Sequence, residues 1–457
     1  MKINISKNLI ELNKLLGGGL YVAGGFVRNR LLSLKSQDID ICGKFTTCEI
    51  EEKLKNSKFM CKDILPRMGT LKIYCKESLE DFEYTTFRTE NYLGGTHTPE
   101  KVEFNANIYE DALRRDFKMN AIYYDIQNDE LIDPTNGLVD IKNKIISCVK
   151  NPYEVFNFDG LRLLRLVRFA AELNFGIEQN TYAAASQNCG KLQDISIERK
   201  TDEFLKIILC DKKYPELDCK FAHYYAVKNL IDLNLMQYLI PQLLSGDKVL
   251  QRTDFHKHDV LEHGLQTFKF SDEKVRLSAL LHDVGKPYIF KRTGKMAGHD
   301  EEGVKIAEEI LTKQIKVSKK QKQDILIEIK THMYDVDGKV NEKKIRLFFI
   351  KYYEHLENIF LLKEADFLGC GLHAGKSEII VKWENILQKM REENVPFKIK
   401  DLKISGFDLL ELNIKDEKIG STLQQLLKLC AANSIKNDRE VLLKEALILN
   451  KIKKDGK

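Results

Sequence analysis

Two aspartates separated by one residue, Asp38 and Asp40, stand near the N-terminus. Residues two apart in an extended strand point to the same face, so the two carboxylates would lie together. Close carboxylates repel each other unless a cation lies between them, and Mg²⁺ binds a few carboxylates together with phosphate oxygens. Two such ions could activate an attacking hydroxyl and stabilise a leaving pyrophosphate. For an isolated Asp-x-Asp, a pair of exposed strand-edge residues is the alternative.

The segment before these aspartates fits a phosphate site. Gly24 and Gly25 end a strand and open a helix, where the backbone can approach a phosphate and the first N–H groups point at it. Arg28 in the first turn could add positive charge. The order strand, Gly-Gly, helix and Asp-x-Asp, here YVAGGFVRNRLLSLKSQDIDI, resembles the nucleotidyltransferase palm of tRNA nucleotidyltransferases and bacterial poly(A) polymerases. That family usually has Asp where this chain has Asn29.

The same resemblance implies further positions downstream. Glu83, in DFEYTTFR, falls where the family often carries a third acidic residue, which would help the metals or hold the primer hydroxyl. Residues 87–90 resemble the family's F-R-x-E segment and place Arg88 among the nucleotide-binding residues. Gly94 and Gly95 follow, and we expect this Gly-rich stretch to be mobile.

A second polar set occurs in LRRDFKMNAIYYD, residues 113–125, which resembles the family's R-R-D-F-x-x-N-A motif. The pattern reads as a helix start, in which residues four apart share a face. Arg can bind phosphate bidentately, and Asp or Asn can hold a ribose hydroxyl. A salt-bridged helix start is the alternative. We expect nucleotide binding by Arg114, Arg115, Asp116 and Asn120.

The segment FNFDGLRLLRLVRFAAELNF resembles the family pattern E-D-P-L-R followed by L-R and R-F-A, with Phe158 and Gly160 in place of Glu and Pro. Asp159 and Arg162 are three apart on one helix face. Cytosine and adenine both present an amino donor beside a ring-nitrogen acceptor. A carboxylate accepts from the amino group and a guanidinium donates to the ring nitrogen, whereas uracil and guanine show the reverse pattern. One Asp–Arg pair would therefore accept CTP and ATP without a nucleic-acid template.

Two more arginines, Arg165 and Arg168, extend this stripe at three-residue steps. They would orient Asp159 or bind phosphate, and surface salt bridges are the alternative. The later segment ISIERKTDEF resembles the family's E-R-x-x-x-E segment, which we interpret as support for the neck that pairs with the arginine stripe.

Histidines and aspartates recur in the middle of the chain, in DVLEHGLQTF, LSALLHDVGKP, GHDEEG, KTHMYD and KEADF. Such side chains suit a divalent transition metal such as Ni²⁺, Mn²⁺, Fe²⁺ or Zn²⁺, which can acidify water for attack on a phosphoester. The series resembles the HD metal-dependent phosphohydrolase domain. That resemblance implies a core ligand set, with two more histidines where two-metal members carry extra ligands: His263, His282, Asp283 and Asp366, then His299 and His332.

The substrate of this second site would be an RNA 2′,3′-cyclic phosphate, a 2′-nucleotide or a phosphomonoester, among which the residues do not choose. The other histidines show no comparable pattern: His97, His223, His256, His258, His355 and His373.

The elements that must position these residues change character along the chain. Strand patterns at 20–22, 38–41, 71–75 and 82–87 surround a helix at 26–34, whereas apolar residues recur at helical spacing from about residue 151 onward. We predict an α+β nucleotidyltransferase palm with a small mixed sheet, then an all-α neck, an HD-type helical body and a helical tail. The predicted domains are the palm or head at 1–145, the neck with its base-reading helix at 146–215, the HD body at 216–390 and a tRNA-binding tail at 391–457.

Composition sets the class of protein. Hydrophobic residues make up 43% and charged residues 31%, a globular profile. The first residues, MKINISKNLI, lack a secretory signal and we find no membrane-length apolar run, so a cytoplasmic protein is expected. The ten cysteines form no C-x-x-C pair and are expected to be reduced packing residues.

The tail carries much of the excess positive charge. Residues 388–457 hold 15 Lys/Arg and 11 Asp/Glu, so +4 of the net charge of +5 lies there. The stretch DLKISGFDLLELNIKDEKIGSTLQQLL resembles the C-terminal segment of tRNA nucleotidyltransferases, with Asp-Glu-Lys in place of the usual P-G-P. We expect salt-sensitive lysine contacts to tRNA phosphates here, although a solvated helical surface is equally compatible with the charge alone.

The patterns together predict a tRNA nucleotidyltransferase that adds CCA from CTP and ATP with Mg²⁺, joined to an HD phosphohydrolase that uses a divalent transition metal. An A-adding enzyme or a poly(A) polymerase is the alternative with the same palm. An HD phosphohydrolase whose N-terminal half only binds RNA, and a non-enzymatic RNA-binding scaffold, are the alternatives from other classes.

Overall fold

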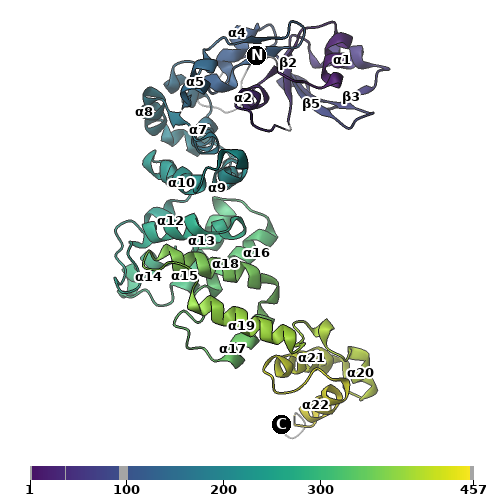
Figure 1. The fold of residues 1–457 in the computed structure, drawn as a ribbon, viewed down its shortest axis with the longest axis vertical. Coiled ribbons are helices and arrows are strands. Elements are labelled where there is room, and N and C mark those ends of the chain that lie inside the picture. Colours follow the sequence, from purple (N-terminus) through teal and green to yellow (C-terminus); the bar gives the residue numbers. More distant parts are fainter. Residues whose placement is uncertain (1–2, 37, 92–100, 453–457) are drawn as a thin grey trace. The chain divides into compact units, whose positions relative to one another are not determined.

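The computed structural model describes residues 3–36, 38–91 and 101–452. Its contacts divide the chain into two compact units, Met1–Pro241 with Thr312–Lys316, and Gln242–Leu311 with Val317–Lys457 (Figure 1). Gly94, Gly95 and His97 lie outside the described residues. None of the helices in the described ranges is both long and apolar enough to cross a bilayer.

The head of the first unit is built on a seven-stranded mixed sheet with the strand order β3-β4-β5-β2-β1-β8-β9. Strands β2 and β5 run parallel, and the other neighbouring strands of this sheet run antiparallel. The strands are β1 (Leu20–Ala23), β2 (Asp40–Gly43), β3 (Phe59–Leu65), β4 (Thr70–Cys75), β5 (Asp81–Thr86), β8 (Tyr123–Asp125) and β9 (Glu130–Ile132). The buried apolar side chains of the sheet and of three helices, α1 (Lys7–Leu16), α2 (Gly25–Leu31) and α3 (Thr47–Leu54), form one core.

Shorter elements complete the head. They are β6 (Thr89–Asn91) paired with β7 (Lys101–Glu103), α4 (Ile108–Arg114), α5 (Gly137–Asn143), and β10 (Ile145–Ile146) paired with β11 (Gly176–Ile177). Asn107 caps α4 in a capping box with Glu110, which satisfies N–H groups that a helix start otherwise leaves unpaired.

The small mixed sheet confirms the predicted fold class. Two details differ from the sequence patterns. Strand β2 begins at Asp40, so Asp38 precedes the strand, and α2 ends at Leu31 rather than at residue 34. Strands β3, β8 and β9 were not predicted: β3 alternates irregularly between exposed and buried residues, and β8 and β9 have three residues each, too few to produce a periodic signal.

Helices follow the head. They are α6 (Pro152–Phe158), α7 (Leu161–Leu173), α8 (Gln179–Gln187), α9 (Ile197–Ile208) and α10 (Ala222–Asp232). One face of α7 is buried through Leu163, Leu164 and Val167, and α7 packs against both α9 and α10. The opposite face carries arginines at three-residue steps, so the amphipathic pattern of this helix fixes which side can reach the head.

The second unit contains helices throughout its described residues. They are α11 (Pro241–Leu244, which begins at the boundary), α12 (Val260–Phe270), α13 (Arg276–Leu281), α14 (Lys286–Thr293), α15 (His299–Lys313), α16 (Lys319–Thr331), α17 (Glu342–Lys351), α18 (Leu356–Gly369), α19 (Glu378–Glu392), α20 (Gly406–Glu411), α21 (Asp416–Ala431) and α22 (Arg439–Ile452). One core surrounds the fully buried Trp383, whose Nε1 donates to Asp335 at 2.9 Å. A separate core joins α20, α21 and α22.

A buried carboxyl group links three helices of this unit. Glu328 on α16 is 1% exposed, and it accepts hydrogen bonds from Ser278 on α13 and from Asn358 on α18, the latter at 2.7 Å. Burial raises the pKa of Glu328 to about 7, although both hydrogen bonds oppose the shift. The protonated carboxyl is therefore the form that this packing favours.

The raised pKa of Glu328 predicts a pH dependence of stability. Because its folded-state pKa of about 7 lies above the ordinary value of 4.5, its contribution is fully present below pH 4.5 and is lost as pH rises to about 7. The loss corresponds to up to about 3 kcal/mol. Urea unfolding of Glu328→Gln should lack this decline in the free energy of unfolding. The exposed Glu301→Gln should retain it, and an unchanged profile in Glu328→Gln would contradict the assignment.

Candidate active sites

The carboxylates of the head meet at the turn between β1 and α2. Gly24 has φ +70° and ψ −139°, a conformation that strongly favours glycine. A Cβ there would lie 3.2 Å from Asp40 Oδ2 and 3.5 Å from Arg115 Nη1. On the neighbouring parallel strand, Glu83 is paired with Asp40 in register, so their side chains share a face. Asp38 is exposed just before β2.

This arrangement suits a cation. Desolvation raises the pKa of Asp40 against the opposing effect of Arg115, and Glu83 and Asp38 contribute further in the upward direction. The Glu83 carboxylate has one positive neighbour, Lys72 Nζ at 3.2 Å. The carboxylates are therefore held together at an energetic cost that a divalent ion with oxygen ligands would relieve.

Arg28 lies on α2 as predicted, but its guanidinium is enclosed by protein groups. It is 3% exposed, and its guanidinium donates to Asn29 Oδ1, to Asn120 Oδ1 at 2.7 Å and to the Tyr214 hydroxyl. Asn29 also donates to Tyr214 at 3.0 Å. A guanidinium committed to these acceptors does not face an open phosphate site. It joins α2 to the motif around residue 120, and Tyr214 is a partner that no sequence pattern indicated.

The R-R-D segment forms no single helix, contrary to the expectation. Helix α4 ends at Arg114, and Arg115 is extended. Both arginines bind Asp111, a fully buried residue that was not predicted: Arg114 Nε at 2.7 Å from Oδ1, and Arg115 Nη2 at 3.2 Å from Oδ2. The Tyr123 hydroxyl donates to the same carboxylate at 2.7 Å. Asp111 thus holds the guanidinium groups of both arginines in place.

Asp116 is held from two sides. Its Oδ1 accepts from Asn120 Nδ2 at 3.1 Å, and its Oδ2 accepts from Arg165 Nε at 2.7 Å. Although burial opposes it, Arg165 and the Asn120 hydrogen bond hold the pKa of Asp116 well below its usual range. Arg88 is also buried, and it donates to the Met68 carbonyl.

Asp159 and Arg162 stand at the start of α7. Asp159 Oδ1 accepts from the Leu161 amide at 3.0 Å and Oδ2 accepts from Arg199 Nη2 at 2.9 Å. Arg162 Nη2 donates to the Arg114 carbonyl at 2.6 Å. A cavity beside them is lined by Thr89, Glu110, Leu113, Arg114, Lys150, Phe158 and Arg162.

The two departures from the family pattern now have a structural setting. Phe158 lines this cavity, with Lys150 Nζ 4.4 Å from its ring centroid. A Cβ on Gly160 would lie 2.4 Å from the Lys191 carbonyl oxygen. The close approach of that backbone excludes any larger residue, including the usual Pro, unless the neighbouring segment moves.

Arg168, the last arginine of the stripe, contacts other protein groups. Arg168 lies between two buried carboxylates, 3.0 Å from Glu172 and 2.5 Å from Glu203. The second contact confirms the predicted pairing between the neck segment and the stripe.

Five side chains of the second unit meet around Asp283, which is the sixth member of the group. His282 precedes it, and His263 on α12, His299 on α15, His332 after α16 and Asp366 on α18 complete the group. Asp283 Oδ2 lies 3.3 Å from His263 Nε2 and 3.2 Å from His282 Nε2. Asp283 Oδ1 lies 3.1 Å from His299 Nε2 and 3.6 Å from His332 Nε2. The six predicted ligands are therefore brought together, with one carboxylate shared between two pairs of histidines.

The donor atoms of this cluster fit a divalent metal. The Nδ1 atoms of His282, His299 and His332 lie 2.6 to 2.8 Å from backbone carbonyl oxygens. Because a carbonyl only accepts, each Nδ1 carries a proton and each neutral ring presents a lone pair at Nε2. Yet Nε2 atoms face each other at 3.3 Å (His263 and His282) and 3.2 Å (His299 and His332). Lone pairs that face each other at these distances repel, so the Nε2 atoms and the nearby carboxylate oxygens need either protons or a shared cation between them.

The electrostatics of the cluster point the same way. Although burial lowers it, Asp283 and Asp366 raise the pKa of His282 to about 10. Lys286, which was not predicted, lies 2.6 Å from Asp283 Oδ2. The site thus stabilises positive charge strongly.

The tail stretch that resembles tRNA nucleotidyltransferases contributes to the core of α20, α21 and α22. Leu409 is buried, and Asp408 caps α20 through Ser405 and pairs with Arg439 at 2.5 Å. These contacts show that the motif stabilises the fold of the tail.

Comparisons with known proteins match three successive segments of the chain. Residues 20–147 match the family described as Poly A polymerase head domain, residues 174–246 the Probable RNA and SrmB-binding site of polymerase A, and residues 258–366 the HD domain. The CCA-adding enzyme of Ligilactobacillus salivarius is 29% identical over 96% of this chain and 94% of its own. The CCA-adding enzyme of Streptococcus mutans is 37% identical over 47% of this chain, and the match spans about half of that relative, 52%.

Solved structures share the fold. The Bacillus stearothermophilus CCA-adding enzyme in complex with CTP superposes with a TM-score of 0.66 at 21% identity, covering 98% of each chain. The Thermotoga maritima CCA-adding enzyme complexed with tRNA gives a TM-score of 0.60 at 19% identity, covering 97% of this chain and 96% of that one.

Removing Arg168 should destabilise the first unit strongly. Arg168→Met leaves the buried Glu172 and Glu203 without their shared partner, which typically costs about 3–5 kcal/mol. Urea unfolding of Arg168→Met should show that loss, whereas Arg30→Met, at an exposed site on α2, should change stability by less than about 1 kcal/mol. Equal effects of the two substitutions would rule out a special role for the buried pair.

The metal-binding geometry should depend on Gly285. A Cβ there would lie 2.2 Å from the His299 carbonyl oxygen and 2.5 Å from the Gly303 amide nitrogen, so Gly285→Ala must push α15 away. We expect a loss of about 1–3 kcal/mol of stability and weaker binding of Ni²⁺ or Mn²⁺ in equilibrium dialysis. Gly420→Ala, where no atom lies within 4 Å of the added Cβ, is the control. Wild-type metal affinity in a folded Gly285→Ala variant would contradict this account.

Proposed function

We propose that this chain, which matches a Poly A polymerase head domain and an HD domain, adds CCA to the 3′ end of tRNA from CTP and ATP. The carrying observation is the meeting of Asp40 and Glu83 on adjacent parallel strands beside the Gly24 turn. Pyrophosphate is the leaving group, and no nucleic-acid template is needed.

The transferase site is proposed to hold Mg²⁺ through Asp38 and Asp40, with Glu83 helping the metals or holding the primer hydroxyl. A divalent ion bound there supplies Lewis acidity toward the attacking hydroxyl and the leaving pyrophosphate. The backbone at Gly24 and Gly25 allows a triphosphate to approach closely, because no Cβ intervenes.

The arginines of the R-R-D segment are proposed to face the nucleotide phosphates. Asp111 holds Arg114 and Arg115 in fixed orientations, so little side-chain freedom would be lost on binding. Arg88, Asp116 and Asn120 are proposed to complete the nucleotide site. Arg28 is proposed to orient Asn120 through its hydrogen bond to that side chain, and not to bind phosphate itself.

Base selection is proposed for Asp159 and Arg162. Arg199 orients the Asp159 carboxylate, and Arg162 uses two of its five N–H donors on the Arg114 and Val155 carbonyls. A cytosine or adenine would offer its amino group to the carboxylate and its ring nitrogen to the guanidinium. A uracil or guanine would leave the carboxylate and the guanidinium facing like partners, which is costly. Arg165 and Arg168 are proposed to hold the base-selecting end of α7 in place through their ion pairs with Asp116 and Glu203.

The second unit is proposed to be a phosphohydrolase that holds a Ni²⁺, Mn²⁺, Fe²⁺ or Zn²⁺ ion among the six ligands around Asp283. Such an ion lowers the pKa of water enough to provide hydroxide near neutral pH. RNA 2′,3′-cyclic phosphates, 2′-nucleotides and phosphomonoesters are the substrate classes. Lys286, paired with Asp283, fixes that carboxylate between the histidines. The tail is proposed to bind tRNA phosphates through lysines.

A poly(A) polymerase or an A-adding enzyme is the second candidate, because the match to the head domain is to the Poly A polymerase family. The primer and nucleotide used by the purified protein separate the candidates. Transfer of C, C and A to tRNA ending at the discriminator base supports CCA addition. A alone after CC indicates an A-adding enzyme, and long A tails a polymerase.

The two sites should be separable by substitution. Asp40→Asn should reduce nucleotide transfer to tRNA at least about 100-fold, because it removes an anionic ligand of the Mg²⁺ that would offset the developing negative charge, while hydrolysis of 2′,3′-cyclic nucleotides with Ni²⁺ stays intact. Asp283→Asn should do the opposite. Asp63→Asn, an exposed position on β3, is the control for the head. Loss of both activities in a folded single variant would contradict two independent sites, and absence of transfer in the wild type would favour the HD hydrolase alone.

A further inference from the structure

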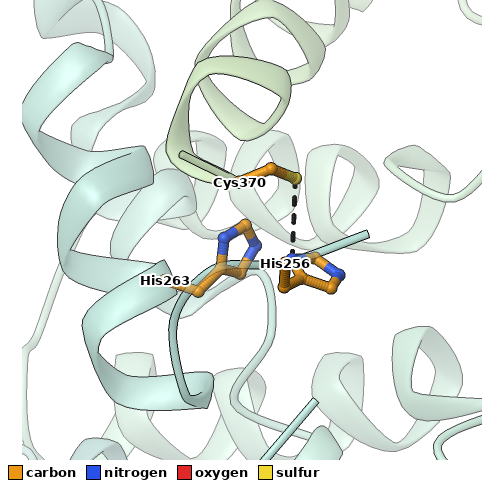
Figure 2. Close-up of side chains that lie close together, drawn as sticks. All are labelled: His256, His263 and Cys370. Atoms are coloured by element: carbon orange, nitrogen blue, oxygen red, sulfur yellow. Dashed lines mark hydrogen bonds between the residues drawn. The ribbon is translucent and has the colours of Figure 1, made fainter. Parts of the chain in front are cut away.

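A second group of soft ligands lies beside the Asp283 cluster. His256 stands in the loop before α12, His263 on α12 and Cys370 directly after α18 (Figure 2). His256 Nδ1 lies 3.5 Å from Cys370 Sγ, and the His256 and His263 ring centroids are 4.5 Å apart. One donor atom from each of the three residues lies within 4.8 Å of the others. All three belong to the second unit.

The backbone holds these side chains in place. The Lys257 amide donates to the Cys370 carbonyl at 3.0 Å, which ties the loop to the end of α18. Gly371 follows with φ +73°, and a Cβ there would lie 2.8 Å from His258 Nε2. Gly369 lies equally close to α12, since a Cβ on it would be 2.2 Å from Thr267 Oγ1. The three donors are thus carried by segments packed too closely to drift apart.

One donor atom of the group lacks a partner. His263 is 0% exposed, and its Nδ1 makes no hydrogen bond to any described residue. Its Nε2 is directed to Asp366 at 3.0 Å and to Asp283. A buried ring nitrogen without a partner is costly. The other three histidines of the Asp283 cluster direct Nδ1 at a backbone carbonyl, so His263 differs from them in this respect.

We propose that His256 Nδ1, His263 Nδ1 and Cys370 Sγ bind a zinc ion, at a second position that shares only His263 with the ligand set of the phosphohydrolase. Tetrahedral Zn²⁺ with bonds of about 2.0–2.1 Å to nitrogen and about 2.3 Å to sulfur places the two ligand atoms about 3.5 Å apart. The observed separation of His256 Nδ1 and Cys370 Sγ is 3.5 Å. Three protein ligands leave the fourth position for water.

Zinc binding here displaces protons in a defined way. The Cys370 thiol loses its proton to solvent when the Zn–S bond forms, since a coordinating thiol is deprotonated. With metals at both ring nitrogens, His263 would also lose its remaining N–H proton to solvent and become an imidazolate. The imidazole then lies between the two metal positions, so occupation of one affects the other.

A nucleophilic Cys–His pair is the chief rival explanation for the contact between Cys370 and His256. Burial and the nearby Asp366 raise the pKa of the Cys370 thiol to about 12. Burial, followed by Lys286 and His263, lowers the pKa of His256 to about 4. The pair is therefore a thiol beside a neutral imidazole, without the thiolate–imidazolium form that such catalysis needs.

Cobalt binding to the metal-free, full-length protein tests the site, because Co²⁺ occupies zinc sites and gives a near-ultraviolet band only when a thiolate is a ligand. We expect the wild type to show this band. Cys370→Ser should abolish it, and His256→Gln should weaken Zn²⁺ binding at least about 10- to 100-fold in competition with a chromophoric chelator. Cys219→Ser, at another half-buried cysteine, should leave the band unchanged.

Asp283→Asn separates this proposal from the proposed hydrolase. It should remove metal-dependent hydrolysis and retain the thiolate band, since Asp283 is not a ligand of the zinc site. The absence of the band in folded wild-type protein would mean that only a thiol–imidazole hydrogen bond exists, and would overturn the proposal. Persistence of the band in Cys370→Ser would do the same.

Discussion

Groups that repel one another are held side by side in both candidate active sites, and the surrounding fold must resist that repulsion. Asp40 stands beside Glu83 on parallel strands, and desolvation raises the pKa of Asp40, with a smaller upward contribution from Glu83. In the second unit, Asp283 lies among four imidazoles whose Nε2 atoms approach one another as closely as 3.2 Å. Such arrangements are stable when a cation compensates the charge, so the spacing fits sites for divalent ions.

Rigid backbone makes these approaches possible. The register of β2 and β5 sets Asp40 opposite Glu83, and the turn at Gly24 admits the carboxylate where a Cβ would intrude. In the second unit, Gly285 lets α15 come close enough for His299 to reach Asp283. Glycines at these positions matter because backbone contact leaves no room for a side chain.

Much of the polar motif in the head acts on other protein groups. Asp111 fixes two arginines, Asp116 accepts from Arg165, and Arg168 bridges two buried glutamates. Side chains held by such ion pairs are already ordered before a nucleotide binds, which reduces the entropy lost on binding. The cost is sensitivity, because removing one partner leaves a buried charge uncompensated. The same interdependence joins the two metal positions that share His263.

Local patterns were sufficient for the fold class and for the order of strand, Gly-Gly and helix, because side-chain spacing on a strand or helix follows from its period. The six candidate metal ligands came from the resemblance to the HD domain, and the structure brings them close together. Strands β3, β8 and β9 escaped detection since short or edge strands carry little periodic signal. Only the tertiary structure decided that Arg28 is enclosed by Asn120 and Tyr214, and that Cys370 lies beside His256. Those partners are 92, 186 and 114 residues apart in the chain, and contacts across such distances depend on how helices pack, which no local pattern encodes.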